Sequence, residues 1–204
     1  SYQCICRGTI EDKKMLKTVF LDRDGVINID SKDYIKTPSE FNFIPKSPEA
    51  IALLNRHGFK VIVITNQSVI ARKMASNETL EAIFDKMKQG VAQAGGKIDD
   101  IFFCPHHPHD SCNCRKPKPQ MILDAAKKHG IDLKFSVMVG DSAKDIECAV
   151  NANCEKKLLV LTGNGEKAKK ELSRKGINPD GCYSDLYEAA NWIVKNFSTQ
   201  TRHI

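Results

Sequence analysis

The sequence predicts a doubly wound α/β fold built on a single, mainly parallel sheet. Short apolar blocks alternate with segments of helical periodicity, which is the pattern of a parallel sheet covered on both faces. With 204 residues, of which 41% are hydrophobic and 27% charged, the chain has the size and composition of one ordinary globular domain. We expect this domain to span residues 15–197, with an appended or disordered segment at 1–14 and a C-terminal tail at 198–204.

The expected strands are short apolar blocks. They span Val19–Leu21, Val61–Ile64, Ile101–Phe103, Val137–Val139 and Leu158–Leu161. Each block is far shorter than the roughly 20 apolar residues that cross a membrane, and no basic and apolar leader opens the chain. We therefore expect a cytoplasmic protein that makes no contact with a membrane.

Helices are expected between these strands, and several carry recognisable end signals. Ser47 is expected to cap the first helix, with Pro48 at its first position and His57-Gly58 at its end. A second helix ends at Gly95-Gly96 and places an apolar stripe on one side, formed by Leu80, Ile83, Phe84, Met87 and Val91. Further helices are expected over Met121–His129, Ala143–Asn151, Glu166–Lys175 and Asp185–Phe197, the last with a capping box of Asp185 and Glu188.

Cysteine spacing predicts one metal site. Eight cysteines are too few for a disulfide-built scaffold of this length, so clustered cysteines are first candidates for metal ligands. Cys104, Cys112 and Cys114, with an imidazole from His106, His107 or His109, form a donor set suited to structural zinc. A Cys112 or Cys114 disulfide and a metal-free loop are the alternatives. Cys4-Ile5-Cys6 has no nearby third ligand, and Cys148, Cys154 and Cys182 are expected to be ordinary core or surface residues.

Polar residues follow the first two expected strands, where open parallel sheets collect their chemistry. Asp22 and Asp24 are two positions apart, so in an extended chain they face the same side, and Gly25 permits a turn after them. One carboxylate could attack a substrate while the other transfers protons. The segment 65–68 offers a hydroxyl and backbone N–H groups that can bind phosphate oxygens. Solvated turns and helix caps are the alternatives for both motifs.

Two further segments add charge at the same edge. Asp141 follows the Val137–Val139 strand, with Asp145 one helical turn further, and a third carboxylate near the first pair would suit Mg²⁺. Three such carboxylates would repel one another without a cation. Lys116 could neutralise a phosphoryl group, and Arg115 could bind a second anionic or hydroxylated part of a substrate. An acidic helix cap and a solvated basic pair are the alternatives.

The combined order of these motifs resembles the haloacid dehalogenase superfamily of phosphatases. The resemblance rests on residues 20–28, 63–68, 114–117 and 139–141, and it covers about residues 15–197. Cys104-Pro105-His106-His107-Pro108 together with Cys112-Asn113-Cys114-Arg115-Lys116-Pro117 resembles the branch of D-glycero-D-manno-heptose 1,7-bisphosphate 7-phosphatases and histidinol-phosphatases. The resemblance implies the Rossmann-like fold of that superfamily, with a zinc-binding loop.

Residue roles follow from the resemblance. It implies that Asp22 forms an aspartyl-phosphate and that Asp24 protonates the leaving oxygen and then activates water. Mg²⁺ would bind Asp22, Asp141 and the main-chain carbonyl of Asp24, while Thr65 and Lys116 hold phosphoryl oxygens and Asp145 supports them. Structural Zn²⁺ would bind Cys104, His106, Cys112 and Cys114. The implied substrate contacts are Asp22, Arg23, Asp24, Asp30, Tyr34, Thr65, Asn66, Gln67, Ser68, Arg115 and Lys116.

Loop lengths indicate an open site. The segment between Asp24 and Asn66 already holds a helix and a loop, so no separate cap domain fits there. We expect residues 30–34 and the zinc loop to form the rim of the site. Five residues separate His106 from Cys112, fewer than in many heptose phosphatases of this type, and Val69 stands where these enzymes usually have glycine.

The implied reaction is Mg²⁺-dependent hydrolysis of a phosphomonoester in carbohydrate metabolism and lipopolysaccharide biosynthesis. The specific prediction is removal of the 7-phosphate of the heptose bisphosphate by a monomeric enzyme, and histidinol phosphate is the alternative substrate. The net charge of +6 and an open site also suggest a nucleic-acid end phosphatase, but no aromatic-rich basic stripe supports nucleic-acid binding. A zinc-ordered binding module without turnover is a further alternative, which the retained catalytic residues argue against.

Overall fold

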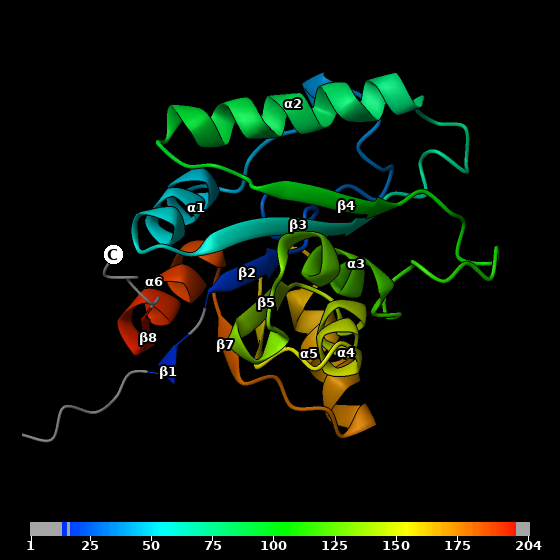
Figure 1. Cartoon of the computed structure of the whole chain (residues 1–204). Helices are drawn as coiled ribbons and strands as arrows, with labels where there is room; N and C mark the ends of the chain where they lie inside the picture. Colours follow the sequence, from blue (N-terminus) through cyan, green and yellow to red (C-terminus); the bar gives the residue numbers. More distant parts are fainter. Residues whose placement is uncertain (1–13, 16, 199–204) are drawn as a thin grey trace, which may run out of the picture.

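A six-stranded parallel sheet forms the centre of the molecule (Figure 1). The structure is a computed structural model that describes residues 14–15 and 17–198. The strands are ordered β4-β3-β2-β5-β6-β7. Their bounds are β2 Thr18–Leu21, β3 Lys60–Asn66, β4 Asp100–Cys104, β5 Ser136–Gly140, β6 Lys156–Val160 and β7 Gly181–Tyr183. Because the chain builds outward from β2 to β4 and then returns to the other side of β2, the order of the strands reverses between β2 and β5.

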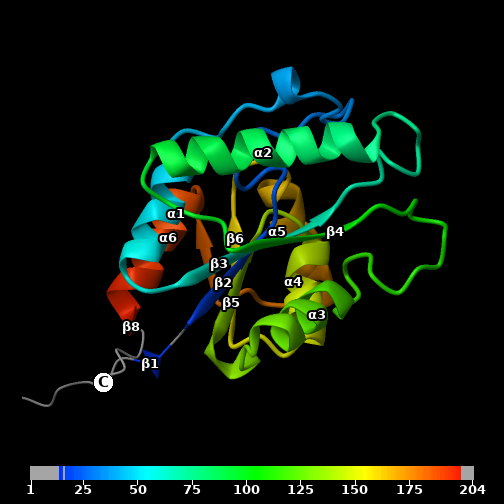
Figure 2. The ribbon, with the colours of Figure 1, turned by 45° about the horizontal axis from the view of Figure 1, so that its top comes forward.

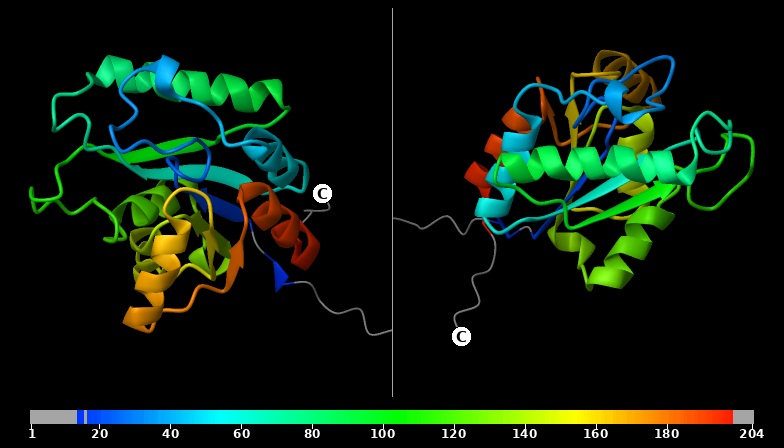
Figure 3. Two further views of the ribbon diagram at one scale, coloured as in Figure 1. Left: turned by 180° about the vertical axis from the view of Figure 1, so that it is seen from behind. Right: turned by 90° about the horizontal axis from the view of Figure 1, so that it is seen from above.

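Three helices cover each face of the sheet (Figures 1 and 3), which confirms the doubly wound fold. On one face lie α1 Ser47–Arg56, α2 Asn77–Gln93 and α6 Leu186–Asn196. On the other lie α3 Gln120–His129, α4 Ala143–Asn151 and α5 Gly165–Lys175. Successive strand residues point to opposite faces, so Val19 and Leu21 join the first core and Phe20 the second. The apolar blocks of the sequence are therefore strands buried on both sides.

Three short strands were not predicted from the sequence. β7 is one of them, because it contains Gly181 and an exposed Cys182 and so has no apolar run. The others are β1 (Lys14–Met15) and β8 (Phe197–Ser198), which pair in parallel as a separate two-stranded sheet. Most of the expected appended segment, including Cys4 and Cys6, and nearly all of the expected C-terminal tail lie outside the described residues.

The start of α1 differs from the prediction. Ser47 is the first helical residue and does not cap the helix, while Lys46 precedes it with a left-handed backbone (φ 65°). The Ser47 hydroxyl instead donates a 2.5 Å hydrogen bond to the Ile27 carbonyl, which ties α1 to the loop after β2. At α6 the expected cap is present, since the Asp185 side chain accepts a hydrogen bond from the Glu188 N–H.

The carboxyl ends of the strands are left open. Between β2 and β3 the chain forms only the 3₁₀ helix η1 (Pro38–Glu40) and α1, so no cap domain is inserted there, as predicted. A second 3₁₀ helix, η2 (Leu133–Phe135), precedes β5. Figure 2 shows β3 and β4 running toward exposed loops at the end of the molecule opposite β1 and β8. None of the helices in the described residues has both the length and the apolar character needed to cross a membrane.

Candidate active site

A pocket of about 320 Å³ opens at the carboxyl ends of β2, β3 and β5. This is the point where the strand order reverses, and ligands of open α/β sheets bind in the crevice at such a point. The loop after β2 contributes Asp22, Asp24, Asp30, Ser31, Lys32, Tyr34 and Ile35, and the end of β3 contributes Asn66, Gln67, Ser68 and Val69. The remaining wall comes from Arg115, Lys116, Asp141, Ser142, Lys144, Asp145 and Asn164.

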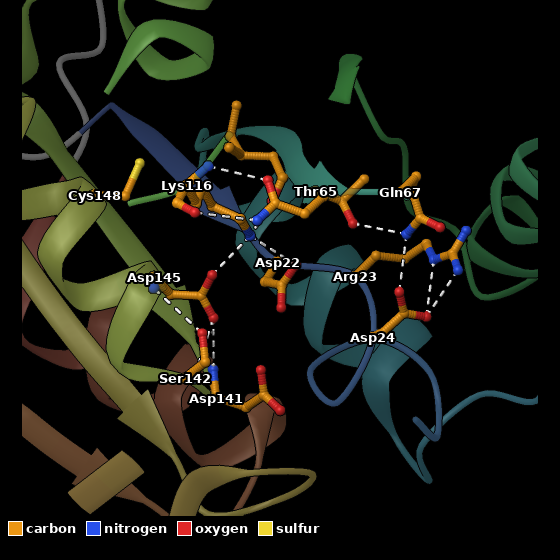
Figure 4. A network of polar contacts seen from close by, with 12 residues as sticks. Asp22, Arg23, Asp24, Thr65, Gln67, Lys116, Asp141, Ser142, Asp145 and Cys148 are labelled. Atoms are coloured by element: carbon orange, nitrogen blue, oxygen red, sulfur yellow. Dashed lines mark hydrogen bonds and ion pairs between the residues drawn. The ribbon is translucent and has the colours of Figure 1, made fainter. Parts of the chain in front are cut away.

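Lys116 is the buried cation at the bottom of this pocket. Its side chain is 3% exposed, and its ammonium donates to Asp22 Oδ1 at 2.9 Å, Asp145 Oδ1 at 2.7 Å and the Ile64 carbonyl at 2.8 Å. All three ammonium protons therefore have acceptors. Burial alone would lower the pKa of Lys116, but the charges of Asp145 and Asp22 outweigh burial and raise it. Lys116 therefore stays charged and holds Asp22 in place (Figure 4).

The Asp141 carboxylate packs directly against the backbone of two glycines, Gly25 and Gly163. A Cβ added at Gly25 (φ +84°) would lie 2.0 Å from Asp141 Oδ2, and one added at Gly163 (φ +55°) would lie 2.3 Å from the same oxygen. Only glycine leaves room for that carboxylate at these positions. Asp141 Oδ2 also accepts a 2.8 Å hydrogen bond from the backbone N–H of Asn164.

The carboxylates repel one another strongly enough to favour a cation. Burial and the neighbouring charges of Asp22 and Asp145 raise the pKa of Asp141 to about 9. Burial and Asp145 likewise raise the pKa of Asp22 to about 7, although Lys116 opposes this. Asp22, Asp141 and Asp145 each place a carboxylate oxygen within 4.8 Å of the others. This all-oxygen donor set fits Mg²⁺.

Asp145 is already engaged by other groups. Its Oδ1 accepts from Lys116, while its Oδ2 accepts from the backbone N–H groups of Asp141 and Ser142 at 3.1 and 3.2 Å. Two reciprocal hydrogen bonds form a capping box at the start of α4. The Asp145 side chain accepts from the Ser142 N–H, and the Ser142 hydroxyl accepts from the Asp145 N–H. Asp145 therefore orients Lys116 and Asp141, which leaves Asp22 and Asp141 as the freer ligands for a cation.

Asp24 is held by a separate network on the other side of the pocket. Its Oδ1 accepts from the Arg23 guanidinium at 2.8 and 3.1 Å and from Asn28 Nδ2 at 2.9 Å, and its Oδ2 accepts from Gln67 Nε2 at 2.8 Å. Burial alone would raise the pKa of Asp24, but the charge of Arg23 and these hydrogen bonds outweigh burial and lower it. Gln67 Nε2 also donates to the Thr65 hydroxyl at 2.9 Å.

The segment that carries Arg115 and Lys116 is fastened to β3. The Asn66 side chain accepts from the Lys116 backbone N–H at 3.0 Å and donates to the Lys116 carbonyl at 3.3 Å. Asn66 lines the pocket, and its amide fixes the backbone from which Lys116 reaches Asp22. Arg115 lies at the mouth, where its Nη1 donates to the His106 carbonyl at 3.4 Å.

Four sulfur and nitrogen donors face one another in the loop after β4. Cys104 Sγ lies 3.0 Å from Cys114 Sγ and 3.6 Å from Cys112 Sγ, and His106 Nδ1 lies 3.2 Å from Cys114 Sγ. The three cysteines are free thiols, so the alternative of a disulfide among them is wrong. Hydrogen bonds from the Arg115 N–H and from Cys104 outweigh the effect of burial and lower the pKa of Cys112 to about 6. Among the candidate imidazoles, it is His106 that joins the cluster.

Most side chains predicted for the site converge on this pocket, with two exceptions. Thr65 is buried behind the wall against Gln67 and does not line the pocket. Arg23 is fully buried, so the structure does not bring this predicted substrate contact to the pocket surface. In an extended segment its side chain points away from the side on which Asp22 and Asp24 lie.

Sequence reasoning missed other residues of the site. The loop after β6 contributes Asn164, whose side chain bonds Asp30 Oδ2 at 3.2 Å, and Thr162, whose hydroxyl donates to the Gly25 carbonyl at 2.6 Å. The signal was present, since Thr162-Gly163-Asn164-Gly165 follows an apolar strand as the other motifs do. Lys144 also lines the pocket, from a helix position that no motif marked.

Comparison with known proteins agrees with this geometry. A family model described as HAD-hydrolase-like matches residues 113–189. A D-glycero-beta-D-manno-heptose-1,7-bisphosphate 7-phosphatase of Bordetella bronchiseptica is 45% identical over 182 residues, which cover 88% of this chain and 99% of that protein. The Escherichia coli protein of the same name is 36% identical over 192 residues, covering 91% and 92% of the two chains.

A solved structure shows the same relationship. The crystal structure of D,D-heptose 1,7-bisphosphate phosphatase from B. bronchiseptica, complexed with magnesium and phosphate, matches with a TM-score of 0.82 at 42% identity. The match covers 88% of this chain and 99% of that one. From the sheet, the site and these matches, the chain belongs to the heptose-1,7-bisphosphate 7-phosphatase family of HAD-like hydrolases.

Proposed function

We propose that this protein hydrolyses the 7-phosphate of D-glycero-β-D-manno-heptose 1,7-bisphosphate. The observation that carries the proposal is the Lys116 ammonium, held at 2.9 Å from Asp22 at the base of a pocket that Asp141 and Asp24 also line. A carboxylate nucleophile, a buried cation and a second carboxylate for proton transfer are the groups that phosphoryl transfer needs.

In the proposed reaction, an Asp22 carboxylate oxygen attacks phosphorus while the bond from phosphorus to the sugar oxygen breaks. The negative charge of a bound substrate would raise the pKa of Asp24, so that Asp24 takes up a proton from solvent. Asp24 gives this proton to the departing oxygen and then takes one from the water that hydrolyses the aspartyl-phosphate. The positive charge of the Lys116 ammonium is proposed to stabilise the phosphoryl oxygens. Thr65, which is buried behind the pocket wall, is proposed to act by holding the Gln67 amide at 2.9 Å. Fixing these groups around one phosphate position converts hydrolysis into two in-line displacements at a single site.

Asp22, Asp141 and the Asp24 carbonyl are the proposed ligands for Mg²⁺. When bound, the ion would neutralise charge on the phosphoryl oxygens. The raised pKa values of Asp22 (about 7) and Asp141 (about 9) support this assignment, because burial and the neighbouring carboxylates both oppose their ionisation, and a divalent cation would favour it.

Two cations at the mouth favour a substrate with a second phosphate. Arg115 and Lys144 both line the pocket, and burial together with the charge of Arg115 lowers the pKa of Lys144. In the described residues Lys144 has neither a hydrogen bond nor an ion pair, so its charge is available to a ligand. A distal phosphate would be attracted there, whereas the ammonium end of histidinol phosphate would be repelled. This observation favours the sugar bisphosphate over histidinol phosphate.

We also propose that Cys104, His106, Cys112 and Cys114 bind structural Zn²⁺. These four protein donors would fill the coordination of a structural zinc ion and would leave no position for a reacting water. Cys114 directly precedes Arg115 and Lys116, so the ion would fix the loop that presents both cations. We further propose a monomer in the cytoplasm, where the thiols that the structure describes would stay reduced.

A substrate panel tests the proposed function. At matched low concentrations, kcat/KM for the heptose bisphosphate should exceed that for histidinol phosphate and for a 3′-phosphorylated oligonucleotide by about 100-fold or more, as two extra charged contacts allow. Phosphate release is the measurement. A preference for histidinol phosphate or the oligonucleotide would exclude the proposed substrate.

Asp22→Asn tests the nucleophile. The amide keeps the shape of the side chain but cannot form the aspartyl-phosphate, so kcat with Mg²⁺ present should fall by about 10⁴-fold or more. Asp124→Asn, on the exposed face of α3, is the matched control and should retain full activity. Turnover of the Asp22→Asn enzyme within tenfold of wild type would contradict the assigned role.

Lys144→Met tests the contact with the distal phosphate. KM for the bisphosphate should rise about tenfold, the loss expected for one charged contact, while KM for heptose 7-phosphate should change less than about twofold. Lys127→Met removes an exposed charge from α3 and serves as the control. Equal changes for the two substrates would show that Lys144 does not bind the second phosphate.

Cys114→Ser tests the zinc loop. The purified variant should contain almost no zinc by elemental analysis, and its kcat/KM should fall by about tenfold or more because Arg115 and Lys116 lose their anchor. Cys182→Ser, at an exposed cysteine outside the loop, should keep both the metal and the activity. Full zinc content in the Cys114→Ser protein, or unchanged kinetics after zinc loss, would refute this assignment.

A further inference from the structure

Arg23 is a charged side chain that the site encloses but the pocket does not expose. It lies between Asp22 and Asp24 in the sequence, yet it is 0% exposed and does not line the pocket. Its guanidinium lies 5.9 Å from the ring centre of Phe41 and 5.8 Å from that of Phe84. The charge is therefore enclosed by the core under α2 and cannot contact a substrate.

Among the residues described by the structure, Asp24 is the one to which the guanidinium donates hydrogen bonds. Its Nε and Nη2 donate to Asp24 Oδ1 at 3.1 and 2.8 Å (Figure 4). Within the residues that the structure describes, Arg23 Nη1 has no hydrogen-bond partner. A buried guanidinium with an unpaired nitrogen is costly, and an apolar side chain of similar size would fill the same space more cheaply. This arrangement points to a role for Arg23 at Asp24 rather than in core stability.

The two oxygens of Asp24 are bound unequally. Oδ1 accepts both Arg23 bonds and a third from Asn28, whereas Oδ2 accepts one bond from Gln67. The Asp24 side chain remains 22% exposed and lines the pocket. The Arg23 fork thus fixes the rotation of the carboxyl group and leaves Oδ2 as the oxygen with spare capacity to face a substrate.

We propose that Arg23 is a positioning residue that aims Asp24 Oδ2 at the leaving-group oxygen. The inference rests on the proposed function, in which Asp22 forms a bond to phosphorus, the bond to the leaving oxygen breaks, and the proton moves from Asp24 to that oxygen. Arg23 touches neither the substrate nor the reacting atoms. Its effect is to hold the proton donor within reach, which a loosely rotating carboxyl group would not achieve.

Dependence on the leaving group distinguishes positioning from a structural role. Arg23→Met keeps the bulk of the side chain and removes the fork. With Mg²⁺ present, kcat/KM for the heptose bisphosphate should fall by about 10²-fold or more, because an alkoxide needs a proton to leave. For p-nitrophenyl phosphate the fall should be less than about threefold, since nitrophenolate leaves without protonation. The ratio kcat/KM reports only the steps up to departure of the alcohol, so hydrolysis of the aspartyl-phosphate does not enter.

Two further variants complete the design. Arg23→Met in an Asp24→Asn background should lower kcat/KM for the bisphosphate by less than about threefold, because the group it positions is already removed. Arg23→Lys retains the charge but not the fork, so it should recover part of the loss. Ile83→Val, a small core change in α2, should affect both substrates equally and only slightly.

Each result decides the proposal. Equal losses on the alkyl and aryl phosphates, additive losses in the double variant, or no loss at all would overturn it. If Arg23→Met does not fold, Arg23→Lys carries the same comparison of leaving groups. If the wild type prefers another alkyl phosphate, the heptose assignment fails, and the test of Arg23 proceeds unchanged with that substrate.

Discussion

The contact between the Lys116 ammonium and the carboxylates of Asp22 and Asp145 is the interaction on which the site depends. Four carboxylates, Asp22, Asp24, Asp141 and Asp145, meet at the point where the strand order reverses, and the two buried cations there are Lys116 and Arg23. With all four carboxylates ionised, these two cations would leave two negative charges, which one divalent cation would offset. A bound divalent cation would reduce the repulsion between these carboxylates and a phosphate dianion, so the charges at the base of the pocket favour a metal there.

Three parts of the structure fix the position of Lys116, which bridges the carboxylates of Asp22 and Asp145. The Asn66 amide holds its backbone with two hydrogen bonds, and the Cys/His cluster lies directly before it in the chain. The Asp145 carboxylate accepts a hydrogen bond from the Lys116 ammonium and is also part of the capping box at the start of α4. Since the Asp145 side chain both caps the helix and orients the Lys116 ammonium, the start of α4 and the charge network form a single unit.

The apolar blocks predicted the sheet and both of its covered faces, because strands buried on two sides carry continuous apolar runs. The same rule of strand ends brought Asp22, Lys116 and Asp141 together in the prediction. The alternation of side chains along an extended segment could also have excluded Arg23 from the pocket, because the Arg23 side chain points to the side opposite those of Asp22 and Asp24. Lys144 could not be predicted in this way, because its approach to Arg115 depends on how α4 packs against a distant loop. β7 was not predicted because it has only three residues, one of them glycine, which is too short for an alternating or continuous apolar pattern.

Chemistry and recognition occupy different parts of the chain. The groups that would act on phosphorus lie on or directly after strands, or are buried against them, as with Asp22, Lys116 and Asp141. The groups at the mouth, such as Tyr34, Arg115 and Lys144, come from loops and a helix surface. Because no cap domain closes over the pocket, these mouth residues are the surface that a sugar beyond the phosphate would meet. Changes there would alter the choice of substrate while the buried charge network, and with it the reaction, stayed intact.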